Sequence, residues 1–378
     1  MPPPPDRLLR DLQRDVHCLF GLPVDNLTMA QTKALLRERC TQEGNTVLAT
    51  INVNWVAESF RDPTFRDAII NSDLVVLDGK PLLWLSRLLG CPMRETVPGS
   101  TLIQELLEEP SDQPLSIFLF GGEGEAAERA MQRINERKNS GLRAVGALNP
   151  GFGTVEEMSS EAIIEAINAT SPDILLVALG AKKGTQWIER NRDRLNAKII
   201  SHLGATINFL AGTVKRAPAF LQRLGLEWVW RILQEPKLVS RYAADGLRVI
   251  RFILPRLPLW WQYRRQLGKI DQQFCGDAFR LLEQSDEHHF VFGLCISKNE
   301  VLRIQRTVAD TAHSKRKVIF DFRKTGFADG SLWAFLLLLL DRFKKGTDKV
   351  ILINCGSAMA KWGRLFHFSQ QAWQLKDS

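Results

Sequence analysis

The residue of this sequence best placed to do chemistry is a carboxylate at the end of a predicted strand. Asp78 follows four apolar residues, Leu74 to Leu77, and precedes Gly79 in the stretch NSDLVVLDGKPLLW. This pair could form a strand-ending turn, in which Asp caps the next helix and Gly allows the bend. It could also place a catalytic carboxylate at the carboxyl edge of a parallel sheet, where such folds bind their ligands. The local pattern allows both interpretations.

Two other stretches place polar groups where predicted strands end. In FGGEG, Gly121 and Gly122 follow a strand and open a helix, so backbone N–H groups there could hold a phosphate. A tight strand–helix turn would explain the same pattern. In HLGATINFLAGTVKRAP, the hydroxyl of Thr206, the amide of Asn208 and a Lys-Arg pair could bind sugar and diphosphate groups. Asn208 could instead cap a helix.

Several catalytic signatures are missing from the sequence. It contains no D-x-D triplet, no P-loop motif and no complete G-x-G-x-x-G, and no Ser/His/Asp set can be recognised. Without a D-x-D pair, the charge of a diphosphate leaving group would have to be balanced by Arg, Lys and helix N-termini. The incomplete glycine fingerprint disfavours a nicotinamide dehydrogenase.

Composition indicates a multidomain globular protein with an anionic partner. The 378 residues suggest two or three domains, and the net charge of +8 favours a nucleotide, an anionic membrane or nucleic acid as partner. The six cysteines are scattered without C-x-x-C spacing, which argues against a zinc site and a disulfide framework and fits a reducing compartment. The N-terminus has no signal core and the longest apolar run is too short to span a bilayer, so we expect a cytoplasmic protein.

Strand-like and helical segments alternate from about residue 45 to residue 212, which predicts an α/β fold with a parallel sheet. The chain between Leu226 and Leu267 instead mixes Trp and Tyr with many Arg, as in a helix on an anionic membrane surface. A nucleic-acid stripe or a solvated helix face would have a similar composition. From about Asp271 a small, separate α/β unit is predicted.

Taken together, the ordered motifs resemble the WecG/TagA/CpsF family of bacterial glycosyltransferases. The resemblance covers about residues 21 to 254 and is carried by Thr50-x-Asn52, DLVVLDG, FLFGG, LGATINFLAGTVKRAP and GLEWVWRILQEPKLVSRY. It implies a Rossmann-like sheet with a helical C-terminal appendage that completes the site at the inner face of the plasma membrane. The implied reaction is inverting and metal-independent transfer from a UDP-sugar to a polyprenyl-diphosphate-linked acceptor in cell-surface or exopolysaccharide biosynthesis.

The resemblance assigns roles and boundaries. It makes Asp78 the general base, which favours the catalytic interpretation of the opening motif, and requires no cofactor and no nucleic acid; a homo-oligomer is compatible with it. The substrate-binding residues predicted are Thr50, Asn52, Arg94, Gly121, Gly122, Lys183, Gln186, Thr206, Asn208, Arg231 and Arg241. The predicted domains are a tail (1–20), the Rossmann-like transferase domain (21–210), the appendage (211–268) and a C-terminal domain (269–378).

The sequence departs from the family pattern at several positions. The usual Arg falls on Thr96, with Arg94 nearby; the usual Gln falls on Gly184, with Gln186 nearby; and Asn208 replaces a common Asp. These changes bear on the donor sugar and motivate an alternative function, a catalytically degenerate transferase that serves as a scaffold.

The C-terminal unit resembles a STAS domain in KVIFDFRKTGFADGSLWAFLLLLL and KVILINCG. Where phosphorylated members of that class have Ser, this chain has Gly330, followed by Ser331. The resemblance therefore implies that the unit docks a protein partner rather than being controlled by phosphorylation.

Overall fold

The computed structural model describes residues 5–270, 279–283, 286–311, 316–346 and 351–368. The chain divides into two compact units. The unit that we call the sheet unit contains residues 27–83 and 94–249, and the unit that we call the terminal unit contains residues 1–26, 84–93 and 250–378.

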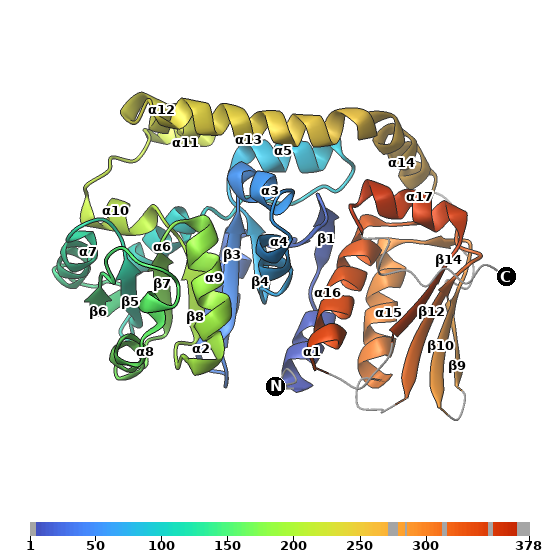
Figure 1. Ribbon diagram of the computed structural model, residues 1–378, viewed down its shortest axis with the longest axis horizontal. Helices are drawn as coiled ribbons and strands as arrows, with labels where there is room; N and C mark the ends of the chain where they lie inside the picture. The colour runs from blue at the N-terminus through green and yellow to red at the C-terminus, as the bar shows by residue number, and fades with distance from the viewer. Residues whose placement is uncertain (1–4, 271–278, 284–285, 312–315, 347–350, 369–378) are drawn as a thin grey trace. The chain divides into compact units, whose positions relative to one another are not determined.

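Six parallel strands form the centre of the sheet unit (Figure 1), in the spatial order β4-β3-β8-β7-β5-β6. Their bounds are β3 (Thr46–Ile51), β4 (Leu74–Leu77), β5 (Leu115–Gly121), β6 (Leu142–Leu148), β7 (Ile174–Ala178) and β8 (Ile199–His202). The predicted α/β fold with a parallel sheet is confirmed. Because all six strands run the same way, their carboxyl ends share one edge of the sheet.

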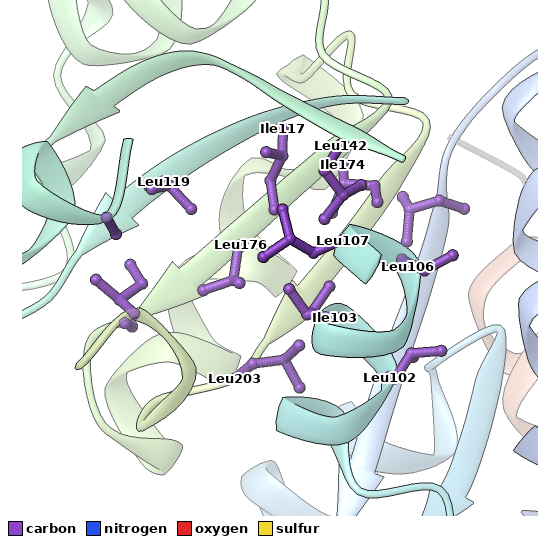
Figure 2. Close-up of a cluster of buried hydrophobic side chains, with 14 of the residues drawn as sticks. Leu102, Ile103, Leu106, Leu107, Ile117, Leu119, Leu142, Ile174, Leu176 and Leu203 are labelled. Carbon is purple, nitrogen blue, oxygen red and sulfur yellow. The ribbon is translucent and has the colours of Figure 1, made fainter. Parts of the chain in front are cut away.

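Helices cover both faces of this sheet. One face packs against α2 (Met29–Cys40), α6 (Gly99–Glu108), α7 (Ala126–Asn135) and α10 (Thr206–Ala211). Figure 2 shows part of that core, where Ile103, Leu106 and Leu107 of α6 lie beside Ile174 and Leu176 of β7. The opposite core contains residues of α8 (Glu161–Asn168) and α9 (Ala181–Asn191). Two more helices of this unit are α3 (Val53–Ser59) and α4 (Pro63–Ile70).

The strands are almost entirely apolar because both of their faces are covered. In β7, Ile174 and Leu176 belong to one core cluster, and Leu175 and Val177 belong to the other. Successive strand residues point to opposite faces, so a strand between two helix layers needs apolar residues at every position. This is why a short apolar run predicted each strand.

Three helices follow the sheet, as predicted for a helical appendage: α11 (Ala219–Arg223), α12 (Glu227–Gln234) and α13 (Leu238–Ile253). The amide of Asn54 in α3 donates a hydrogen bond of 2.9 Å to Asp245 in α13 and so ties the appendage to the sheet unit. Across the described residues, no helix is both long and apolar enough to cross a bilayer.

The terminal unit contains a mixed sheet in the order β14-β12-β10-β9, in which β9 is antiparallel to β10. Its elements, in chain order, are α1 (Pro5–Leu12), β1 (Val16–Leu19), β2 (Leu22–Asp25), α14 (Leu257–Ile270), β9 (Phe279–Glu283), β10 (Glu287–Phe292), β11 (Cys295–Ile296), α15 (Lys298–Thr311), β12 (Lys317–Phe322), β13 (Phe327–Ala328), α16 (Gly330–Gly346), β14 (Ile351–Cys355) and α17 (Ser357–Leu365). Helix α5 (Lys80–Leu88) has residues in both units.

Helix α16 is buried all round, since the side chains from Leu332 to Leu339 are each at most 8% exposed. One side contacts the mixed sheet, where the rings of Phe335 and Phe320 lie 6.4 Å apart. The β1–β2 hairpin packs against α16 as well. The hairpin turns at Phe20 and Gly21. Both residues have positive φ, which a two-residue hairpin turn of type I′ requires.

Two features of this unit differ from the sequence analysis. No element was predicted before residue 21, whereas α1 and β1 lie there. Reduced cysteines were expected throughout, and Cys295 is disulfide-bonded, although Cys18, Cys40, Cys91 and Cys355 are free. The predicted domain boundaries stay predictions.

Candidate active site

Asp78 lies at the carboxyl edge of the parallel sheet, directly after β4. Its backbone N–H donates to the carbonyl of Ile51 over 2.7 Å, which continues the pairing of β4 with β3. Gly79 has a φ of +101°, a backbone conformation that favours glycine. The half-buried carboxylate of Asp78 accepts no hydrogen bond from any described residue, so it does not cap α5.

The surroundings of Asp78 raise its pKa from 3.8 to about 7. Burial, which disfavours the charged form, is the largest cause, and the negative charge of Glu227 in α12 acts in the same direction. Arg231 and Arg216 lower the pKa but do not offset the burial. A carboxyl group with a pKa near 7 can accept and release a proton at neutral pH, which is what a general base must do.

The two cations beside Asp78 are held around one aromatic ring. The guanidinium carbons of Arg216 and Arg231 lie 5.8 Å and 5.7 Å from the ring centre of Phe209 in α10. Arg216 also donates to the side chains of Thr101, at 2.8 Å, and Gln104 in α6. Arg216 is therefore fixed before any ligand binds and can stabilise a negative charge without reorganising.

The turn after β5 depends on its glycines. Gly121 and Gly122 both have a φ of +96°, and the N–H of Gly122 donates to the carbonyl of Ala178 over 3.0 Å. A Cβ on Gly121 would lie 2.5 Å from that carbonyl oxygen. On Gly122 it would lie 3.1 Å from a methyl group of Ile207 in α10. Close packing alone explains the two glycines, so they give no independent sign of a phosphate site.

The residues predicted after β8 lie in α10. Thr206 is its first residue and is buried, at 3% exposed. Asn208 is inside the helix, whose N-cap is Ala205, so the capping interpretation of Asn208 is wrong. The Oδ1 atom of Asn208 is buried and has no hydrogen-bond partner among the described residues. An unpaired buried acceptor is costly, and a ligand that donates to it would remove that cost.

The residues predicted around β3 have a partly structural role. Thr50 is buried within the strand, and its hydroxyl oxygen lies 3.2 Å from the position that a Cβ on Gly99 would take. Asn52 is the N-cap of α3, because its side chain accepts from the N–H groups of Asn54, at 3.0 Å, and Trp55, at 3.2 Å.

Four predicted residues are not brought to Asp78 by any described contact. Lys183 donates to the carbonyl of Gly153 over 2.8 Å, and Gln186 is half-buried in α9. Arg94 is exposed. Arg241 is exposed on α13, with its guanidinium 5.6 Å from the ring centre of Tyr242.

The structure also explains Gly184, where the resemblance leads one to expect Gln. A Cβ on Gly184 would lie 2.1 Å from Cδ2 of His202, the last residue of β8, so this position cannot hold a side chain without rearrangement. Burial lowers the pKa of His202 to about 4, so the ring is neutral at pH 7. Its Nε2 atom has no hydrogen-bond partner among the described residues. Sequence reasoning missed His202 because nothing in its local pattern marks it.

A carboxyl group with a pKa of about 7 and two arginines near it, at the carboxyl edge of a parallel α/β sheet, are groups that an enzyme could use to transfer a group from an anionic leaving group. The model of the glycosyl transferase WecG/TagA/CpsF family matches residues 17–265, which is more than half of the chain. The chain therefore belongs to this family and is a glycosyltransferase. The match ends before the mixed sheet of the terminal unit.

Curated relatives cover most of the same region. A protein of Staphylococcus aureus (strain MRSA252), named N-acetylglucosaminyldiphosphoundecaprenol N-acetyl-beta-D-mannosaminyltransferase, is 26% identical over 227 residues, which are 59% of this chain and 86% of the relative. Proteins of the same name from strains MW2 and NCTC 8325 / PS 47 are each 25% identical over equal shares.

Proposed function

We propose that this chain is an inverting, metal-independent glycosyltransferase that moves a hexosyl or N-acetylhexosaminyl group from a UDP-sugar to a polyprenyl-diphosphate-linked acceptor in bacterial cell-surface polysaccharide biosynthesis. The observation that carries the proposal is the carboxylate of Asp78, which has a pKa of about 7 and lies beside two cations at the carboxyl edge of the sheet. The names of the curated relatives support an acceptor with an undecaprenyl diphosphate.

In the proposed reaction, Asp78 takes the proton of the acceptor hydroxyl as the hydroxyl oxygen attacks the anomeric carbon. A new C–O bond forms on one face while the bond to UDP breaks on the other, so the configuration inverts. The electron pair of the broken bond leaves with the diphosphate. Arg216 and Arg231 would balance that charge, which is the role that a metal ion has in many related reactions.

We propose that the protein binds the inner face of the plasma membrane peripherally, through exposed apolar and basic side chains of the appendage. Helices α11 to α13 expose Phe220, Leu224, Trp228, Leu233, Val239 and Leu247. Lys237 and Arg241 are exposed on the same segment. Apolar side chains with cations are typical of a surface that binds anionic lipid.

The vesicle test uses two leucines of similar exposure. Leu233, which is 69% exposed in α12, and Leu294, which is 77% exposed in the terminal unit, are each replaced by Glu. We expect Leu233→Glu to weaken sedimentation with anionic vesicles and Leu294→Glu to leave it unchanged. Binding should also weaken as salt rises, because ions screen the attraction. Adsorption that ignores both salt and Leu233→Glu would contradict the membrane proposal.

A donor screen tests the transferase proposal itself. The full chain is incubated with a series of UDP-sugars and a short-chain polyprenyl-diphosphate-sugar acceptor, with and without EDTA, and products are read by mass. We expect one donor to give a product one sugar larger, whether or not EDTA is present. Calorimetric titration with the same donors provides the second measurement. Absence of both product and UDP-sugar binding would favour the alternative scaffold function.

We further propose that the predicted C-terminal domain (269–378) is a STAS-like module, which the strand order β14-β12-β10-β9 and the helices between these described strands support. The loop that corresponds to the phosphorylation site of such modules, residues 329–331, is buried in this chain. The hydroxyl of Ser331 is buried and donates to Asp329 over 2.6 Å. A Cβ on Gly330 would lie 3.1 Å from the sulfur of Cys91. This loop therefore offers no free docking surface, which weakens the scaffold alternative.

A further inference from the structure

A pocket beside the proposed base is not explained by the roles given so far. It has a volume of about 510 Å³, within the size range of small-molecule sites. Three helices of the sheet unit, α6, α7 and α10, and the segment after α10 form its walls. The lining residues include Ser100, Gln104, Leu107, Arg133, Arg137, Phe209 and Arg216.

The lining combines cations with apolar side chains. Three arginines, Arg133, Arg137 and Arg216, face one acid, Glu136. Arg133 is held in place, since it donates to the carbonyl of Ala211 over 3.0 Å. The remaining wall is largely apolar and is built from Leu107, Ile134, Phe209, Leu210 and Val214. Such a mixed lining suits a ligand that carries both a phosphate group and a hydrocarbon chain.

Two residues of the pocket are linked to the surroundings of the proposed base. Arg216 lines the pocket and also lowers the pKa of Asp78. Phe209 lines the pocket and carries Arg216 and Arg231 on its ring. A ligand whose diphosphate lies at Arg133 and Arg137 can therefore extend a linked sugar past Arg216 toward the carboxylate of Asp78, where an acceptor hydroxyl has to be.

We propose that this pocket binds the diphosphate and the first isoprenyl units of the lipid-linked acceptor. The proposal rests on the proposed function and deepens it, because it assigns the acceptor rather than the UDP-sugar to the space between α6, α7 and α10. Arg137 and Arg133 contact the diphosphate, and Leu210, Val214 and Ile134 contact the hydrocarbon.

Binding of farnesyl diphosphate to the full chain, measured by calorimetry, tests the arginines of the pocket. Arg137 is exposed just after α7, so Arg137→Ala should fold normally. The matched control is Arg129→Ala within α7, where Arg129 pairs with Glu125 outside the pocket. Losing a hydrogen bond to a charged group weakens binding about tenfold or more. We therefore expect Arg137→Ala to weaken the binding of farnesyl diphosphate about tenfold or more and to leave UDP binding unchanged. Arg129→Ala should bind farnesyl diphosphate with wild-type affinity.

A comparison of inorganic diphosphate with farnesyl diphosphate tests the apolar side chains of the pocket. We expect Leu210→Ala to weaken binding of farnesyl diphosphate but not of inorganic diphosphate. Equal affinity of the wild-type protein, Arg137→Ala and Leu210→Ala for farnesyl diphosphate would overturn the pocket assignment, whatever the donor screen gives. If the pocket variants behave as expected while no UDP-sugar binds or reacts, the pocket assignment stands and the transferase proposal fails.

Discussion

The raised pKa of Asp78 predicts how the rate depends on pH. With a pKa of about 7, the carboxyl group is ionised to about one tenth at pH 6 and to about nine tenths at pH 8. Only the ionised form can act as a base. We therefore expect kcat/KM to rise about tenfold between pH 6 and pH 8 and then to level off. A carboxylate with its ordinary pKa of 3.8 would already be fully ionised at pH 6.

The assay measures initial rates from pH 5.5 to pH 9 with the donor found in the screen. Asp78→Asn is expected to reduce turnover about 10²–10⁴-fold, which is the usual contribution of general acid–base catalysis. The residual rate of this variant should no longer rise through pH 7. Asp112→Asn, which changes an exposed loop carboxylate, serves as the control and should keep the wild-type profile.

Asp78→Asn, which should lower activity, should raise the stability of the folded protein. In the unfolded chain Asp78 ionises near pH 4, whereas in the folded protein it keeps its proton until about pH 7, so its effect on stability becomes less favourable between these values. At about 1.4 kcal/mol per pKa unit, the upper bound of the cost above pH 7 is about 4 kcal/mol. Asp78→Asn removes this cost, and its thermal midpoint at pH 8 should exceed that of the wild type. A flat wild-type pH profile, or full activity of Asp78→Asn, would refute the assignment.

Four further substitutions test the packing and one ion pair. Gly184→Gln should lower the free energy of unfolding by about 1–3 kcal/mol or more, because its Cβ would overlap the ring of His202; an unchanged urea midpoint would contradict this. Gly330→Ser should be destabilising through its contact with Cys91, and Cys91→Ala should relieve part of that loss. Arg192→Ala should lower the free energy of unfolding in thermal melts by about 1.5–3 kcal/mol, since it removes the charge-assisted hydrogen bond to Asp73, whose half-buried carboxylate still accepts from the N–H of Val47. Wild-type melting of Gly330→Ser or of Arg192→Ala would contradict the argument made for that variant.

The strands of the parallel sheet could be predicted from the sequence because the pattern that marks each strand lies within a few neighbouring residues. A strand such as Ile174–Ala178 is covered on both faces and therefore appears as an apolar run between turn residues. The hairpin of β1 and β2 could not be predicted in the same way. Its buried residues pack against α16, and no pattern within residues 16–25 indicates that partner.

The candidate site was only partly predictable for the same reason. Asp78 was recognisable because a carboxylate at a strand end is a local signal. Its pKa is raised by burial first and by Glu227 second, and lowered in part by Arg231 and Arg216, and these groups come from distant parts of the chain. Asn52 shows the converse: a polar residue at the end of a strand was predicted to bind sugar, and its side chain oxygen caps α3.

The burial of α16 by the N-terminal hairpin has a consequence for synthesis. The hairpin leaves the ribosome well before the helix that covers it, which follows only after about 300 residues, or about 15–60 s at 5–20 residues per second. During that interval the apolar side of β1 and β2 has no native cover. Nascent chains that stall before α16 is complete should therefore be strong chaperone substrates, and nonsense mutations that remove α16 should affect the fate of the hairpin at residues 16–25.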